Sequence, residues 1–67
     1  MKRRRIINLY GESFVEAKSL RRSDPVVVAK QFHIVERVNV HDMFTYVHYS
    51  DVGLKRHFNN QLIKLVK

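Results

Sequence analysis

The spacing of turn-forming residues constrains the fold of this chain more than any other feature of its sequence. Clusters rich in glycine, proline, asparagine, aspartate and serine recur at intervals of roughly 9–16 residues, with β-branched and aromatic residues between them. This pattern is typical of a small, mainly β protein, and it predicts an antiparallel meander or a small SH3-like antiparallel barrel. The clusters are Tyr10–Glu12, Arg22–Pro25, Asn39–Asp42, Ser50–Gly53 and Asn59–Asn60.

The chain is 67 residues long, which predicts one domain with a small core. We expect residues 1–5 to form a basic N-terminal arm and residues 6–67 to form a single globular domain. The sequence contains no cysteine, so disulfides and thiolate-bound metals cannot support the core. A chain without cysteine suits a reducing compartment, and we expect an intracellular protein of the cytoplasm or nucleus. The longest apolar run, Val26–Ala29, is too short to cross a bilayer, so no membrane partner is expected.

The clearest strand signal lies between residues 32 and 40. The even positions are apolar and the odd positions mostly polar, with Glu36 as the exception. A two-residue loop at His41-Asp42 and a four-residue loop at Ser50–Gly53 would complete a three-stranded meander over residues 32–58. Because opposed residues share a face, this register predicts a core side made of Ile34, Glu36, Val38, Val40, Met43, Thr45, Val47, Tyr49, Leu54, Arg56 and Phe58.

The N-terminal third allows two interpretations. Apolar residues from Ile7 to Leu20 recur every three or four positions, which favours an amphipathic helix, and Asp24-Pro25 could begin another helix. Gly11 interrupts the first pattern, however, and three consecutive valines favour a strand after Pro25. The strand interpretation of Phe14–Leu20 is slightly preferred. The alternative is an α+β fold with an N-terminal helix on a three-stranded sheet.

Three short motifs resemble SH3-like barrels of the Tudor type over residues 9–66. They are Gly11-Glu12-x-Phe14-Val15-x-Ala17-Lys18, the segment from Tyr46 to Gly53, and Gln61–Leu65. The resemblance implies binding of methylated peptides, nucleic acid or other proteins. Val52 stands where the family usually has an aromatic cage residue, and methyl-lysine recognition needs such rings. A rival resemblance, to a helix-turn-helix, uses Val28-Ala29-x-x-Phe32-x-Ile34, with His33 and Asn39 departing from that pattern.

Charge and aromatic residues indicate what the surface binds. The chain carries a net charge of +7, and both ends are basic while the middle is mildly acidic. The predicted face opposite the core interleaves rings with cations, as single-stranded nucleic acid requires. We therefore expect a nucleic-acid-binding module for DNA or RNA. The candidate residues are Lys2, Arg3, Arg4, Arg5, Arg21 and Arg22 in the basic segments, and Arg37, Phe44, Tyr46, His48, Lys55 and His57 on the predicted face, which also includes His33, Val35 and Asn39.

Other functions stay open at this stage. The positive charge could instead dock an adaptor or inhibitor on an acidic protein partner. Apolar residues near the C-terminus could pair two copies into a homodimer. The four histidines fit no dense metal-ligand motif, and no serine lies in a nucleophile signature. We therefore expect a non-enzymatic protein without a metal or cofactor.

Overall fold

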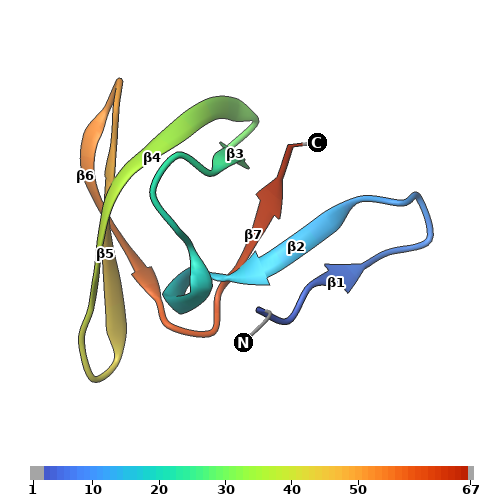
Figure 1. Ribbon diagram of the computed structural model, residues 1–67, viewed down its shortest axis with the longest axis horizontal. Coiled ribbons are helices and arrows are strands. Elements are labelled where there is room, and N and C mark those ends of the chain that lie inside the picture. The colour runs from blue at the N-terminus through green and yellow to red at the C-terminus, as the bar shows by residue number, and fades with distance from the viewer. Residues whose placement is uncertain (1–2, 67) are drawn as a thin grey trace.

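A computed structural model describes residues 3–66 and shows a mainly β protein (Figure 1). Seven strands form one antiparallel sheet in the order β1-β2-β7-β3-β4-β5-β6, and the sheet is not closed. The prediction of a small, mainly β fold is therefore confirmed. The elements are β1 (Ile6–Ile7), β2 (Ser13–Glu16), the 3₁₀ turn η1 (Ala17–Ser19), β3 (Pro25–Val28), β4 (Gln31–Val40), β5 (Phe44–Tyr49), β6 (Gly53–Phe58) and β7 (Leu62–Leu65).

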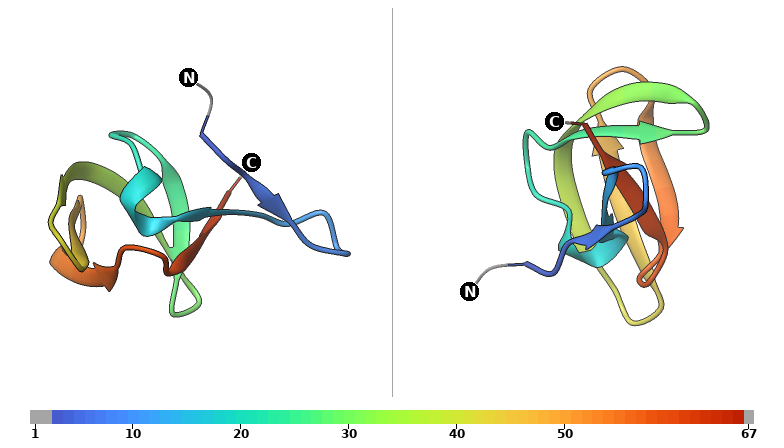
Figure 2. Two further views of the ribbon diagram at one scale, coloured as in Figure 1. Left: turned by 90° about the horizontal axis from the view of Figure 1, so that it is seen from below. Right: turned by 90° about the vertical axis from the view of Figure 1, so that its right-hand side faces the viewer.

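Strand β4 joins the two parts of the sheet. Its first residues pair with β3 and its last residues pair with β5, with a bulge between Val35 and Arg37. A bulge adds a residue to one strand and bends it, so the β4–β5–β6 part turns across the rest of the sheet (Figures 1 and 2). Glu36, the one residue that breaks the apolar alternation, lies at this bulge.

The core fills the space between the two parts of the sheet. Because the bulge shifts the alternation by one residue, His33 and Val35 point inward while Ile34 is only partly buried. The predictions that Ile34 belongs to the core face, and His33 and Val35 to the opposite face, are therefore wrong. The buried hydrophobic residues are Val15, Ala17, Leu20, Val26, Val35, Val47, Tyr49, Ile63 and Leu65.

Both predicted hairpin registers are shifted, with different consequences. In the first hairpin the His41 N–H donates to the Phe44 carbonyl at 2.8 Å, so the turn is Asp42-Met43. Val38 then pairs with Val47 instead of Thr45, a shift of two residues that keeps the faces of β5 as predicted.

The second hairpin is shifted by a single residue, which exchanges the faces of β6. Tyr49 pairs with Gly53 instead of Leu54, across a three-residue turn. Gly53 directly follows this turn and has a positive φ of 76°, a conformation that glycine adopts without strain. Leu54, Arg56 and Phe58 therefore lie on the outer side of the sheet, and the prediction that they line the core is wrong.

No α-helix occurs between residues 3 and 66. The segment predicted as strand or helix becomes β2 followed by the single turn η1, and Pro25 begins β3. The α+β alternative and the helix-turn-helix resemblance are therefore wrong. The segment that suggested a helix-turn-helix forms the β3–β4 hairpin, whose turn residues Ala29 and Lys30 both have positive φ. Within the described residues no helix has the length and apolar character needed to span a membrane.

Candidate nucleic-acid interface

The outer side of β4, β5 and β6 carries a surface that we call the basic-aromatic face. On β5 its residues alternate with the buried Thr45, Val47 and Tyr49, so they must point away from the core. Cross-strand pairs bring its members together on adjacent strands: Phe44 with Phe58, Tyr46 with Arg56, and His48 with Leu54 on β6 and Arg37 on β4. The face consists of Arg37, Asn39, Phe44, Tyr46, His48, Leu54, Arg56 and Phe58.

Two arginines on this face are aligned with ring systems. The Arg56 guanidinium lies 4.4 Å from the centre of the Phe44 ring, a cation–π contact. Phe44 also packs against Phe58, with ring centres 5.0 Å apart, while Phe58 itself remains 59% exposed. The Arg37 guanidinium donates to His48 Nε2 at 3.4 Å. These contacts orient both guanidinium groups without neutralising them.

A shallow depression of about 380 Å³ opens at the centre of this surface. Tyr46 forms one wall and meets the His41 ring edge to face, with ring centres 5.1 Å apart. The depression therefore offers aromatic and polar groups side by side, which is how proteins hold an unstacked base. Its lining residues are Asn39, His41, Tyr46, His48 and Leu54.

No acidic side chain stands at the outward positions of β5 and β6. The nearby carboxylate of Asp51 is already paired, because His33 Nδ1 lies 2.8 Å from both of its oxygens. This hydrogen bond holds the pKa of Asp51 below its ordinary value. The outward positions of β5 and β6 thus carry positive charge without an acid, and the exposed acid next to this face on β4 is Glu36, beside Arg37.

Two predicted site residues on β6 do not belong to this face. Lys55 and His57 lie on the inner side of β6, because of the one-residue shift in register. His57 is only 7% exposed, and its Nε2 lies 2.9 Å from the Tyr49 hydroxyl. Burial lowers the pKa of His57, with a further decrease from the charge of Lys55, and burial raises the pKa of Tyr49 to about 12. His57 is a neutral core residue, and its predicted placement on the binding face is wrong.

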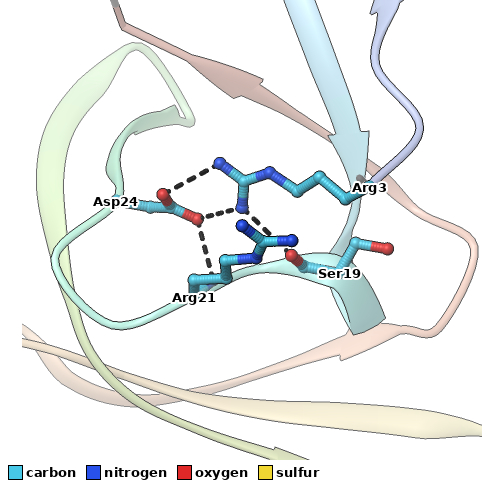
Figure 3. A network of polar contacts seen from close by, with 4 residues as sticks. All are labelled: Arg3, Ser19, Arg21 and Asp24. Atoms are coloured by element: carbon cyan, nitrogen blue, oxygen red, sulfur yellow. Dashed lines mark hydrogen bonds and ion pairs between the residues drawn. The ribbon is translucent and has the colours of Figure 1, made fainter. Parts of the chain in front are cut away.

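The arginines of the N-terminal segment differ from one another. Arg3 forms two hydrogen bonds with the Asp24 carboxylate, at 2.5 and 3.0 Å, and donates to the Ser19 carbonyl at 3.0 Å (Figure 3). The Arg21 backbone N–H donates to the same carboxylate at 2.7 Å. Burial raises the pKa of Asp24, but the hydrogen bonds from Arg3 and Arg21 outweigh it and leave the pKa lowered. Arg3 therefore has a structural role.

The other predicted basic residues are free at the surface. Arg4, Arg5, Arg21 and Arg22 are exposed, and none forms an ion pair with another residue in the range 3–66. Lys2 lies outside the described residues. The structure thus separates Arg3, whose charge is neutralised, from four arginines that remain available to an anionic ligand.

Leu54, Arg56 and Phe58 are surface residues that the sequence pattern predicted for the core side. A signal for them exists, since a glycine at the end of a short hairpin loop favours a three-residue turn with a left-handed last position. A prediction with Gly53 at that position would have put Arg56 and Phe58 on the outer side of the sheet and His57 on the inner side.

No group of three or more histidine and acidic side chains that could hold a metal ion is found within residues 3–66. Comparison of the chain with protein families, with curated proteins and with solved structures finds no match. The basic-aromatic face itself is therefore the basis for a functional conclusion.

Proposed function

We propose that this protein binds single-stranded nucleic acid through the basic-aromatic face. The observation that carries the proposal is the outer side of β4, β5 and β6, where Arg37 and Arg56 lie beside aromatic rings on neighbouring strands and no acid stands at the outward positions of β5 and β6. Tyr46 and Phe58 offer exposed ring surface for stacking, which is worth about 1–3 kcal/mol per base. Arg37 and Arg56 lie beside these rings, where phosphates would follow the stacked bases.

The available arginines of the N-terminal segment would add contacts that do not depend on sequence. Each phosphate neutralised by an arginine releases counterions, so affinity should fall steeply as salt is raised. Aromatic stacking is less sensitive to salt and tolerates every base. The proposal is therefore a module with strong salt dependence and a preference for single strands over duplexes.

The test compares two adjacent basic residues of β6 that lie on opposite sides of the sheet. Arg56→Ala should weaken binding to a labelled oligonucleotide of about 20 nucleotides by about tenfold and reduce the salt slope by about one. Lys55→Ala removes the same charge from the inner side and should have a much smaller effect. Tyr46→Ala should also weaken binding by about tenfold.

Titrations at about 50 and 200 mM salt, with circular dichroism of each variant, complete this experiment. Equal losses for Arg56→Ala and Lys55→Ala would show that only net charge matters, and would overturn the role of the face. An affinity that stays unchanged in both variants would also overturn the role of the face.

A second candidate function follows from the position of β6 at the end of the sheet. The six residues of β6 have no neighbouring strand on their outer edge within the described chain. An exposed edge can accept a strand from an acidic protein partner. Capture of a specific protein that survives nuclease treatment, together with no oligonucleotide binding at low salt, would favour this alternative.

We also propose that the bent sheet is a variant of the SH3-like barrel. Support comes from the Tudor-type motifs and from η1, where the Ala17 and Lys18 N–H groups donate to the Gln61 and Asn59 carbonyls. These bonds tie the end of β2 to the loop that follows β6. An experimental structure in which the strands enclose a continuous barrel would support this assignment, and an open sheet would count against it.

A further inference from the structure

The hairpin formed by β1 and β2 holds two large apolar side chains in solvent. It extends away from the rest of the sheet, at the opposite end of the molecule from β5 and β6 (Figures 1 and 2). At its tip Leu9 is fully exposed and Tyr10 is 88% exposed. Neither belongs to the core, so packing inside this chain does not account for them.

The tip is nevertheless rigidly organised by Asn8. Its Oδ1 accepts hydrogen bonds from the N–H groups of Tyr10 at 2.9 Å and Glu12 at 3.0 Å, and its Nδ2 donates to Glu12 Oε1 at 2.9 Å. Two backbone bonds close the same turn, and Gly11 supplies the positive φ of 77°. A tip fixed in this way loses little conformational entropy when Leu9 and Tyr10 contact a ligand.

Both strands of the hairpin are also tied to the body of the protein. The chain just before β1 is held by Arg3 on Asp24 (Figure 3). The turn leading into β2 is held by an ion pair between Glu12 and Lys64, and the hydrogen bond from Lys64 lowers the pKa of Glu12. The direction in which the tip points is therefore fixed.

The charge around the hairpin indicates the class of ligand. Glu12 is neutralised by Lys64, while Arg4 and Arg5 are exposed and have no ion pair with any residue between 3 and 66. Both arginines precede β1, so the uncompensated positive charge of the hairpin lies at its base and not at its tip. A hairpin with arginines at its base and an exposed ring and apolar side chain at its tip matches nucleic acid, which offers phosphates and base faces along one strand.

We propose that the β1–β2 hairpin is a second nucleic-acid contact, in which Tyr10 stacks on a base, Leu9 packs against the same or the next base, and Arg4 and Arg5 bind phosphates farther along the same strand, at the base of the hairpin. The inference rests on nucleic acid being the ligand, as proposed above, and adds a separate site. The molecule is 30 Å along its longest axis. A stacked strand rises about 3.4 Å per nucleotide, so about nine nucleotides would connect the two sites.

Single-tryptophan variants test the hairpin and the face independently, because the natural chain contains no tryptophan. Tyr10→Trp reports on the tip, Tyr46→Trp on the basic-aromatic face, and Phe32→Trp is the control. Phe32 is an aromatic residue that is 55% exposed and belongs to neither site. Each variant is titrated with an unlabelled single strand of about 20 nucleotides, and tryptophan emission is recorded.

The proposal predicts that emission falls by about half in Tyr10→Trp and Tyr46→Trp and stays unchanged in Phe32→Trp. Quenching of Tyr46→Trp alone would overturn the hairpin site and leave the proposed function intact. Quenching of Tyr10→Trp alone would support the hairpin and overturn the role of the face. If no variant responds and no binding is measured at low salt, both proposals fail.

A second variant and a second ligand strengthen the experiment. Leu9→Ala/Tyr10→Ala should weaken binding by about tenfold and leave the circular dichroism spectrum unchanged, since both side chains are exposed. Unchanged affinity in this double variant would count against the hairpin site. Vesicles of anionic phospholipid are added to Tyr10→Trp in parallel. A blue shift with vesicles and no quenching by the oligonucleotide would assign the tip to a lipid surface and overturn the proposal.

Discussion

The inner and outer sides of the β4–β5–β6 part of the sheet carry the same kinds of side chain and use them in opposite ways. On the inner side, Tyr49 and His57 are buried and bonded to each other. On the outer side, Tyr46 and His48 remain partly exposed, and Arg56 lies over a ring without an acidic partner. Residue type therefore does not separate the polar groups that are bonded within the fold from those that are left exposed on the outer side. The partner of each group does.

The N-terminal arginines repeat this contrast on a smaller scale. Arg3 is held by a carboxylate and a carbonyl, whereas its neighbour Arg4 is exposed. An arginine whose hydrogen bonds are satisfied within the fold contributes to stability and offers little to a ligand. Matched residues from these two classes should therefore respond differently to substitution.

The two tyrosines of β5 should separate stability from binding most clearly. Tyr49→Ala removes a buried ring and should lower the free energy of unfolding by about 3–5 kcal/mol. Tyr46→Ala removes a partly exposed ring and should lower it by about 1 kcal/mol or less. Urea titration followed by circular dichroism measures both. A loss for Tyr46→Ala as large as that for Tyr49→Ala would break the distinction between the two sides.

Arg3 and Arg4 should show a smaller difference of the same kind, with the greater loss of stability for the arginine that is bonded within the fold. Arg3→Ala leaves the partly buried Asp24 carboxylate without its main partner and should cost about 1–3 kcal/mol of stability. Arg4→Ala should change stability by less than about 0.5 kcal/mol while reducing the salt slope of oligonucleotide binding. Thermal unfolding and binding titrations test this pair. If Arg4→Ala destabilises the protein as much as Arg3→Ala does, the assignment of roles fails.

The buried His57 should make the stability of the protein depend on pH. The pKa of buried His57 is lowered in the folded protein, whereas it returns to about 6.5 in the unfolded chain. Below about pH 6.5 the unfolded chain therefore binds a proton that the folded protein does not, and stability falls as the pH drops from about 7 to 5.

His57→Gln should make this dependence flatter than it is in the natural protein. Urea titrations at intervals between about pH 7 and 5 measure the difference. The carboxylates with lowered pKa values lose their stabilising charge at lower pH and do not interfere. An unchanged slope in His57→Gln would show that its neutral form does not limit stability in acid.

Much of the strand pattern could be predicted from the sequence, but the faces of the strands could not. Alternation and turn clusters located the strands between residues 32 and 58, because those signals are local. A register shift of one residue exchanges the two faces of a strand, however, and the sequence leaves such shifts almost unconstrained. The two errors in the predicted faces arose at Glu36, where a bulge interrupts β4, and at Gly53, which follows a shorter turn than predicted.

The candidate site shows the same limit. The alternation along residues 32–49 predicts Arg37, Phe44, Tyr46 and His48 on the outer side, and they lie there. Their role in binding stays a prediction. The pairing of Arg3 with Asp24 joins residues 21 positions apart. No local pattern encodes such a contact, because it depends on how the chain before β1 returns to the body.

The smallest expected effect comes from the β3–β4 turn and serves as a control for the whole comparison. Ala29 has a φ of 51° and Lys30 a φ of 65°, a conformation that favours asparagine and glycine. Ala29→Asn keeps the charge of the chain and should stabilise the protein by about 0.5–1 kcal/mol. Combined with Tyr46→Ala, it should restore the lost stability and leave nucleic-acid binding weak. Recovery of binding in the double variant would show that Tyr46 acts only through stability, and the outer side would then resemble the inner one.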